Sequence, residues 1–218
     1  SSRLVAQIGG MEKGVVRIGT FNSACVEWMP SLLRGFEKDY PNIRIDIYQG
    51  SYDDVYQWLK DGIVDLGFLS STSAGDLSCT PIYQDKIICV APQGFKTENE
   101  GYITIEELKK QRFVTQREGC DADVNHVMNK YDLPGGGGSY IADDMSAVSL
   151  VMGGFGVCLM PELVIRNIPF PVDVIPLEVE EKRTIVLAYV RSDVLAPAVQ
   201  KMQSYILESF QKKAEEEQ

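Results

Sequence analysis

The first third of the chain alternates short apolar runs with helical patterns. Residues 15–19 form an apolar run typical of a buried strand, and apolar side chains then recur at helical spacing until Pro41. Alternating isoleucines predict a strand at 43–47, Ser51 to Asp54 supply capping residues for a second amphipathic helix, and 65–69 predicts a third strand. This strand and helix alternation predicts a parallel sheet covered on both faces.

The rest of the chain repeats the alternation with shorter segments. Residues 86–91 predict a strand, and Thr104 with Glu107 has the spacing of a capping box that opens a short helix. Further strands are predicted at 113–115, 140–142, 157–160, 174–177 and 184–190, and further helices at 121–131, 146–152 and 198–210. A second α/β unit is therefore expected.

Composition narrows the possible classes of protein. The 218 residues are 44% hydrophobic and 24% charged, which is ordinary for a globular protein. With 21 Lys and Arg against 31 Asp and Glu, the net charge is -10, so a phosphate backbone would repel the chain. The longest charge-free stretch, 145–161, contains three glycines and is too short for a membrane span, and 1–13 shows no secretory signal pattern. Five scattered cysteines without a CxxC pair favour reduced thiols and a cytoplasmic location.

Signatures of catalysis and of cofactor binding are absent. His126 is the only histidine, which excludes multi-histidine metal sites, and Leu159 stands where a dinucleotide fingerprint needs its last glycine. No cofactor, no metal and no enzymatic activity are therefore expected. The adjacent Asp143 and Asp144 leave two interpretations open: an acid/base pair or cation site, or one helix cap at Ser146 beside a solvated carboxylate.

Polar residues follow several predicted strands at their carboxyl ends, where open α/β sheets bind ligands. They are Thr20, Asn22 and Ser23 after the first strand, Ser70 and Ser71 after the third, and Thr115, Gln116, Arg117, Gly119 and 143–146 in the second unit. Helix N-termini at Ser23 and near Asp121 would favour an anionic ligand. Ser23 alone could equally be a plain N-cap.

Two blocks of sequence carry a family resemblance. The first is Gly14-Val-Val-Arg-Ile-Gly19, Met29-Pro30, Tyr40-Pro41 and Asp65-Leu66-Gly67; the second is 150–161, Leu-Val-Met-Gly-Gly-Phe-Gly-Val-Cys-Leu-Met-Pro. Their order and spacing resemble the effector-binding domain of LysR-type transcriptional regulators, and the resemblance extends from about 14 to 210.

The resemblance implies an α/β fold like the type 2 periplasmic binding proteins, with two Rossmann-like subdomains joined by two crossover strands. Residues 1–13 would end a linker helix, 14–85 with 189–218 would form the first subdomain, and 86–188 the second. The crossovers are expected near 85–88 and 185–190.

The resemblance also implies the residues that contact the effector. They are Thr20, Asn22, Ser23, Leu69, Ser70, Ser71, Thr115, Arg117, Gly119, Cys120, Asp144 and Met145. Cys120 lies where peroxide-sensing members of the family carry a reactive cysteine. No resolving cysteine occurs in 121–130, and Asp121 and Asp123 would oppose a thiolate, so redox sensing is the minor alternative.

The implied function is to sense a small anionic or polar metabolite in the cleft between subdomains. DNA contact is expected only through a winged helix-turn-helix that normally precedes this domain. The implied assembly is a homodimer, and a tetramer in the full-length protein. In the dimer, helix 24–38 of one chain would pair with helix 121–131 of the other, and Trp28 would be an apolar anchor. The alternatives are a transporter's solute-binding protein and an enzyme that uses Asp143 or Asp144 with Arg117.

Overall fold

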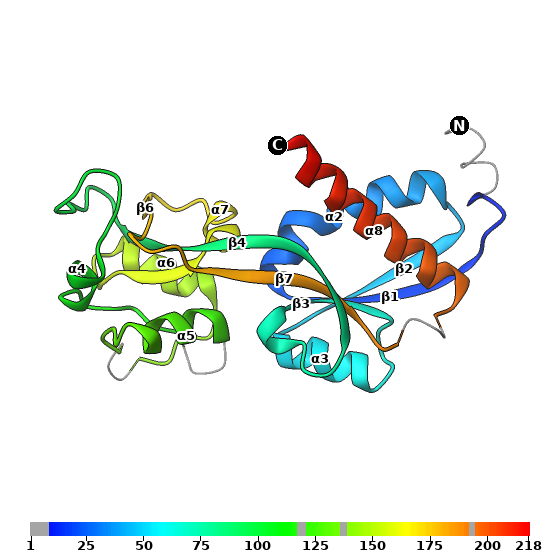
Figure 1. Ribbon diagram of the computed structural model, residues 1–218, viewed down its shortest axis with the longest axis horizontal. Coiled ribbons are helices and arrows are strands. Elements are labelled where there is room, and N and C mark those ends of the chain that lie inside the picture. Colours follow the sequence, from blue (N-terminus) through cyan, green and yellow to red (C-terminus); the bar gives the residue numbers. More distant parts are fainter. Residues whose placement is uncertain (1–8, 117–120, 136–138, 192–194) are drawn as a thin grey trace. The chain divides into compact units, whose positions relative to one another are not determined.

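The computed structural model describes residues 9–116, 121–135, 139–191 and 195–218, and the chain divides into two compact units. Unit 1 comprises Ser1–Tyr83 and Thr184–Gln218, and unit 2 comprises Gln84–Arg183. Figure 1 follows the chain through both. The sequence put the boundaries at 85/86 and 188/189. Both boundaries fall earlier, at 83/84 and 183/184. The second moves further because Ile185 to Ala188 pair with a strand of unit 1.

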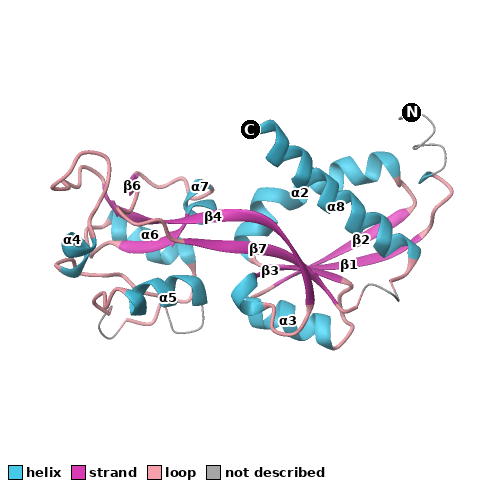
Figure 2. Cartoon of the chain, viewed as in Figure 1, coloured by secondary structure: helices cyan, strands magenta, loops and turns pink. Residues whose placement is uncertain are grey.

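Unit 1 is built on a sheet of order β2-β1-β3-β7. The strands are β1 (Gly14–Thr20), β2 (Ile43–Gln49), β3 (Leu66–Ser70) and β7 (Lys182–Tyr189), and the helices are α2 (Asn22–Asp39), α3 (Tyr52–Lys60) and α8 (Pro197–Glu216). β1 pairs in parallel with β2 and β3, as predicted, whereas β7 joins β3 in antiparallel register. Figures 1 and 2 show α2 and α8 on one face of this sheet and α3 on the other.

Local sequence explains where α3 begins. The Ser51 hydroxyl accepts a hydrogen bond from the Asp54 N–H at 3.1 Å, and the Asp54 carboxylate accepts one from the Ser51 N–H at 2.9 Å. This reciprocal pair satisfies two backbone donors that helix geometry leaves free, so the predicted cap is confirmed.

The core of unit 1 gathers around Trp28. Its ring meets Phe210 edge-on at 4.7 Å and Tyr83 at 5.3 Å between ring centroids, and the side chain is only 4% exposed. The sequence offered Trp28 as an apolar anchor on a dimer surface, and that expectation is wrong. Helix α8 returns across α2 and buries the indole within the unit.

Unit 2 is built around β4 (Ser78–Pro92), which begins in unit 1 and pairs in antiparallel register with β5 (Cys158–Pro161) and β6 (Val172–Ile175). Its helices are α4 (Ile105–Lys109), α5 (Ala122–Lys130), α6 (Asp144–Met152) and α7 (Glu162–Arg166). Along β4, Ile87 and Cys89 enter one core cluster with Val127 and Met128 of α5. Ile88 and Val90 enter a second cluster with α6 and α7, so both faces of the sheet are covered.

Several predictions for unit 2 need correction. The strands predicted at 113–115 and 140–142 are isolated parallel bridges, Phe113 to Val157 and Gln116 to Ile141. A short apolar run has the same sequence pattern whether it forms a single bridge or a continuous strand. Thr104 caps α4 as predicted, but the Glu107 carboxylate accepts the N–H of Glu98 instead of completing the box. No helix in the described ranges combines the length and apolar character needed to cross a bilayer.

Candidate functional site

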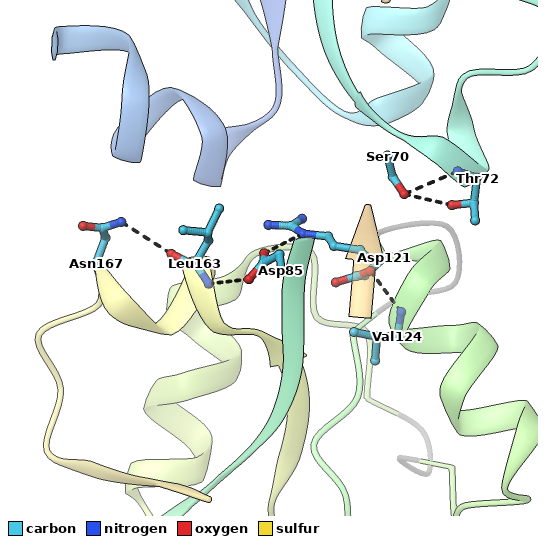
Figure 3. A network of polar contacts seen from close by, with 8 residues as sticks. Ser70, Thr72, Asp85, Asp121, Val124, Leu163 and Asn167 are labelled. Carbon is cyan, nitrogen blue, oxygen red and sulfur yellow. Dashed lines mark hydrogen bonds and ion pairs between the residues drawn. The ribbon is translucent and has the colours of Figure 1, made fainter. Parts of the chain in front are cut away.

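In unit 1, two hydroxyl side chains end neighbouring parallel strands. Thr20 ends β1 and Ser70 ends β3, and both are fully buried. The Thr20 hydroxyl donates to the Phe21 carbonyl at 3.0 Å. The Ser70 hydroxyl oxygen lies 3.0 Å from the Thr72 hydroxyl oxygen and accepts a hydrogen bond from the Thr72 N–H at 3.4 Å (Figure 3).

A short 3-10 turn, η1 (Ser71–Ser73), fixes Ser70 from the following residues. The Ser70 N–H donates to the Ser73 hydroxyl at 3.1 Å, and that hydroxyl donates to the Ser70 carbonyl at 2.9 Å. Ser71 is exposed on this turn, whereas Leu69 is fully buried in β3 opposite Val186.

Helix α2 starts beside these strand ends with an apolar residue in the capping position. Phe21 is the N-cap, and its side chain has no oxygen that could accept a first-turn N–H. Asn22 is exposed, and Ser23 is 6% exposed inside the first turn, so the alternative of Ser23 as an N-cap is wrong. The start of this 18-residue helix carries positive partial charge, which favours an anion.

Unit 2 contains a cavity of about 30 Å³ beside the start of α5. Its polar lining residues are Thr115, Gln116, Asp121 and Asn125. Apolar side chains from several elements complete the wall: Phe113, Val114, Val124, Met128, Ala147, Cys158, Leu159 and Met160. A volume of this size holds roughly two water-sized groups.

Asp121 is both the N-cap of α5 and part of the cavity wall. Its carboxylate accepts the N–H of Val124 at 3.1 Å, as drawn in Figure 3. Burial raises the pKa of Asp121 to about 7, against the opposing charge of Arg183 and the hydrogen bond from Val124. Asp123 and Asp144 add to the rise because they are like charges.

The two adjacent carboxylates before α6 have different roles. Asp143 caps the helix, accepting the Ser146 N–H at 2.8 Å and its hydroxyl at 2.7 Å, so the cap interpretation is confirmed. The other half of that interpretation, a solvated Asp144, is wrong: Gln116 donates a side-chain N–H to the Asp144 carboxylate at 2.6 Å. Burial raises the pKa of Asp144, although the bond from Gln116 opposes the rise.

Sequence reasoning missed a buried ion pair in unit 2. The Arg183 guanidinium donates to the Asp85 carboxylate at 2.8 Å, and the Leu163 N–H donates to the same carboxylate at 3.1 Å (Figure 3). Burial raises the pKa of Asp85 despite Arg183. The signal in the sequence was weak: two charged residues beside apolar strand segments, 98 positions apart.

The predicted contact residues are distributed over both units. Thr20, Ser23 and Ser70 gather at the strand ends of unit 1, and Thr115 lines the cavity of unit 2. Arg117, Gly119 and Cys120 lie outside the described residues. Met145 is 52% exposed on α6, and His126 is exposed on α5. Within the described ranges, no group of acidic, cysteine or histidine side chains could hold a metal ion.

Comparison with known proteins identifies the family of this chain. A family model described as LysR substrate binding domain matches residues 9–211. The uncharacterized HTH-type transcriptional regulator YvbU of Bacillus subtilis (strain 168) is 21% identical over 171 residues, 78% of this chain. The match covers 58% of that regulator, so the chain spans less than two thirds of its length.

Solved structures share the fold. The effector binding domain of QuiR in complex with shikimate matches with a TM-score of 0.80 and 19% identity, over 92% of this chain and 99% of that one. The regulatory domain of Synechocystis PCC6803 CcmR in complex with 2-PG matches with a TM-score of 0.81 and 16% identity, over 91% and 98%. These matches confirm the predicted fold class.

Proposed function

The chain belongs to the LysR substrate-binding domain family, and from that premise we propose that it senses a small anionic or polar effector for a DNA-binding transcriptional regulator. The observation that carries the proposal is the start of α2. An 18-residue helix without a side-chain cap begins directly after β1, which pairs in parallel with β3, and Thr20, Ser23 and Ser70 of these three elements are buried.

The ligand class follows from these groups. Backbone N–H groups of the first turn and serine hydroxyls donate hydrogen bonds to an anion or a polar oxygen without a buried cation. Shikimate, the molecule named in the QuiR structure, is a carboxylate of this kind. Thr115, Arg117, Gly119, Cys120, Asp144 and Met145 are the contacts that we propose in unit 2, with Asn22, Leu69 and Ser71 completing those of unit 1.

We extend the proposal to the whole regulator. DNA binding would reside in a helix-turn-helix outside these 218 residues, because the chain itself carries a net charge of -10. Effector binding would act by preferring one conformation of the chain over another. The assembly would be a homodimer that pairs α2 of one chain with α5 of its partner, and a tetramer in the full-length protein. A monomer at micromolar concentration in sedimentation would contradict this pairing.

The proposal is tested first by ligand screening. A library of small carboxylates, phosphates and polyols is tested for an increase in the melting temperature of the chain, and the hits are titrated by calorimetry. Ser23→Ala and Thr115→Ala should each weaken binding about tenfold or more, because each removes a hydrogen bond to a charged or polar ligand group. The melting temperatures of the unliganded variants should stay close to that of the parent.

Two outcomes would contradict the proposal. If no class of small molecule raises the melting temperature, the sensing function fails. If the two variants lose their fold, Ser23 and Thr115 are structural residues. Catalysis is tested in the same samples: we expect NMR spectra of a bound ligand to stay unchanged on prolonged incubation, and turnover abolished by Asp144→Asn would favour an enzyme instead.

A further inference from the structure

The wall of the unit 2 cavity combines a carboxylate with neutral polar groups. The Gln116 amide donates one of its two N–H groups to Asp144 at 2.6 Å, which leaves its carbonyl oxygen and one N–H for a ligand. The Asp121 carboxylate, on the same wall, can only accept when it is ionised. Thr115 and Asn125 supply groups that can accept as well as donate.

The charges around the cavity favour a cation. Among the described residues, Asp85, Asp121 and Asp144 all lie within the electrostatic influence of one cation, Arg183. That guanidinium is bonded to Asp85 at 2.8 Å and is 3% exposed. Asp123, which also acts on Asp121, is buried and adds a further carboxylate.

An entering carboxylate would meet this excess of negative charge in a small cavity whose wall is mostly apolar. A nearby negative charge disfavours a second one, whereas an ammonium group is attracted by the carboxylates and can donate hydrogen bonds to the acceptors of the wall. The cavity of about 30 Å³ has room for roughly two water-sized groups, which matches a terminal methylene with its ammonium nitrogen.

We propose that this cavity receives a protonated amine of the effector, held by the Asp121 carboxylate and the Gln116 carbonyl oxygen. The inference rests on the proposed sensing function and narrows its ligand class.

The test uses the whole chain with methyl groups labelled for NMR. Methylammonium chloride is titrated above about pH 7, where the Asp121 carboxyl is ionised, while the signals of Met128, Ala147 and Met160 are followed. Sodium acetate, methanol and sodium chloride serve as matched probes. We expect methylammonium to shift these three signals saturably, and acetate and methanol to leave them where sodium chloride does. Equal shifts from acetate or methanol, or none from methylammonium, would overturn the assignment.

Asp121→Asn isolates the charge, because asparagine caps a helix about as well as aspartate. This variant should bind methylammonium about tenfold more weakly, the effect of losing a hydrogen bond to a charged group. Asp53→Asn, an exposed carboxylate in the first turn of α3 of unit 1, changes the net charge equally and should have no effect. Unchanged methylammonium affinity in Asp121→Asn would contradict the role of the carboxylate.

The same spectra separate this inference from the proposed function. Ala24 lies in the first turn of α2, and its methyl signal reports acetate binding in unit 1. An Ala24 signal that does not shift, together with no hit in the ligand screen, would count against the sensing function. The methylammonium result at Met128 and Ala147 would still stand or fall on its own. Movement at Ala24 without movement at Met128 and Ala147 would overturn only the amine assignment.

Discussion

The Arg183 guanidinium donates to the Asp85 carboxylate at 2.8 Å, and the two side chains are 3% and 1% exposed. Asp85 stands in β4 and Arg183 in β7, the two strands whose sequences run on from one unit into the other. The Leu163 N–H shares the same carboxylate, so the pair also holds the start of α7. Removing one partner of a buried charge pair lowers the stability of the fold, because the other charge stays buried without compensation.

Arg183→Met should therefore lower the free energy of unfolding by about 3–5 kcal/mol, because it leaves the Asp85 carboxylate buried without its cation. Denaturation of the chain by urea measures the loss. The control is Arg44→Met, which removes an exposed pair with Asp46 and should cost roughly 0–1 kcal/mol. In the double variant Asp85→Asn with Arg183→Met, the loss should be smaller than the sum of the single losses. Equal effects of Arg183→Met and Arg44→Met would contradict the importance of burial.

Asp121 should make stability fall as the pH rises from about 4 to about 7. Its pKa is about 7 in the folded chain and roughly 3.9 when unfolded, so across this window the folded state binds the extra proton. The stabilising effect of that proton is complete near pH 4 and lost above pH 7, a change on the order of 2–4 kcal/mol. Carbon NMR of the Asp121 carboxyl gives the midpoint directly. A midpoint near 4, or an identical pH profile for Asp121→Asn, would refute the prediction.

Glu181 joins the end of α5 to the segment before β7, and it should stabilise unit 2 only while ionised. Its carboxylate accepts from the Lys130 ammonium and from the Tyr131 hydroxyl, each at 2.6 Å. Burial favours a higher pKa for Glu181, but these two hydrogen bonds outweigh it and lower the pKa. Glu181→Gln should thus cost about 1–2 kcal/mol at pH 7.

The sign of this pH dependence is opposite to that of Asp121. Because the folded pKa of Glu181 is lowered, its contribution is present above the unfolded value of about 4.3 and disappears as the pH falls through the folded pKa. The difference between the parent chain and Glu181→Gln should shrink in urea titrations as the pH is lowered below about 4.3. A difference that stays constant as the pH falls would indicate that shape, and not charge, holds α5 at this point.

Gly67 should not tolerate a methyl group. A Cβ atom at this position of β3 would lie 2.8 Å from Val55 and 2.9 Å from Leu59 of α3, so the helix and sheet would have to separate. Gly67→Ala should lower the free energy of unfolding by about 1–3 kcal/mol, as overpacking does in closed cores. Gly135→Ala is the control, because no described atom lies within 4 Å of its Cβ, and it should stay within about 0.5 kcal/mol. Similar losses in both variants would contradict the close packing of α3 on β3.

Pattern predicted the elements of unit 1 better than those of unit 2. The parallel strands and amphipathic helices of unit 1 carry strong periodicity, and the cap of α3 lies within four residues, Ser51 to Asp54. The segments around Phe113 and Ile141 pair through single bridges, which a local pattern cannot distinguish from strands. For the candidate site, the hydroxyls after β1 and β3 were predictable because strand ends of a parallel sheet lie side by side.

The sequence by itself determined the family, the fold class and the polar strand ends, because these depend on short-range spacing and on the order of motifs. Only the tertiary structure decided that Trp28 is buried by α8 and that Asp144 accepts a hydrogen bond from Gln116. It alone paired Asp85 with Arg183 across 98 positions and raised the pKa of Asp121. Burial and charge pairing depend on which distant segments meet, and that is a property of the packed chain and not of any local stretch of it.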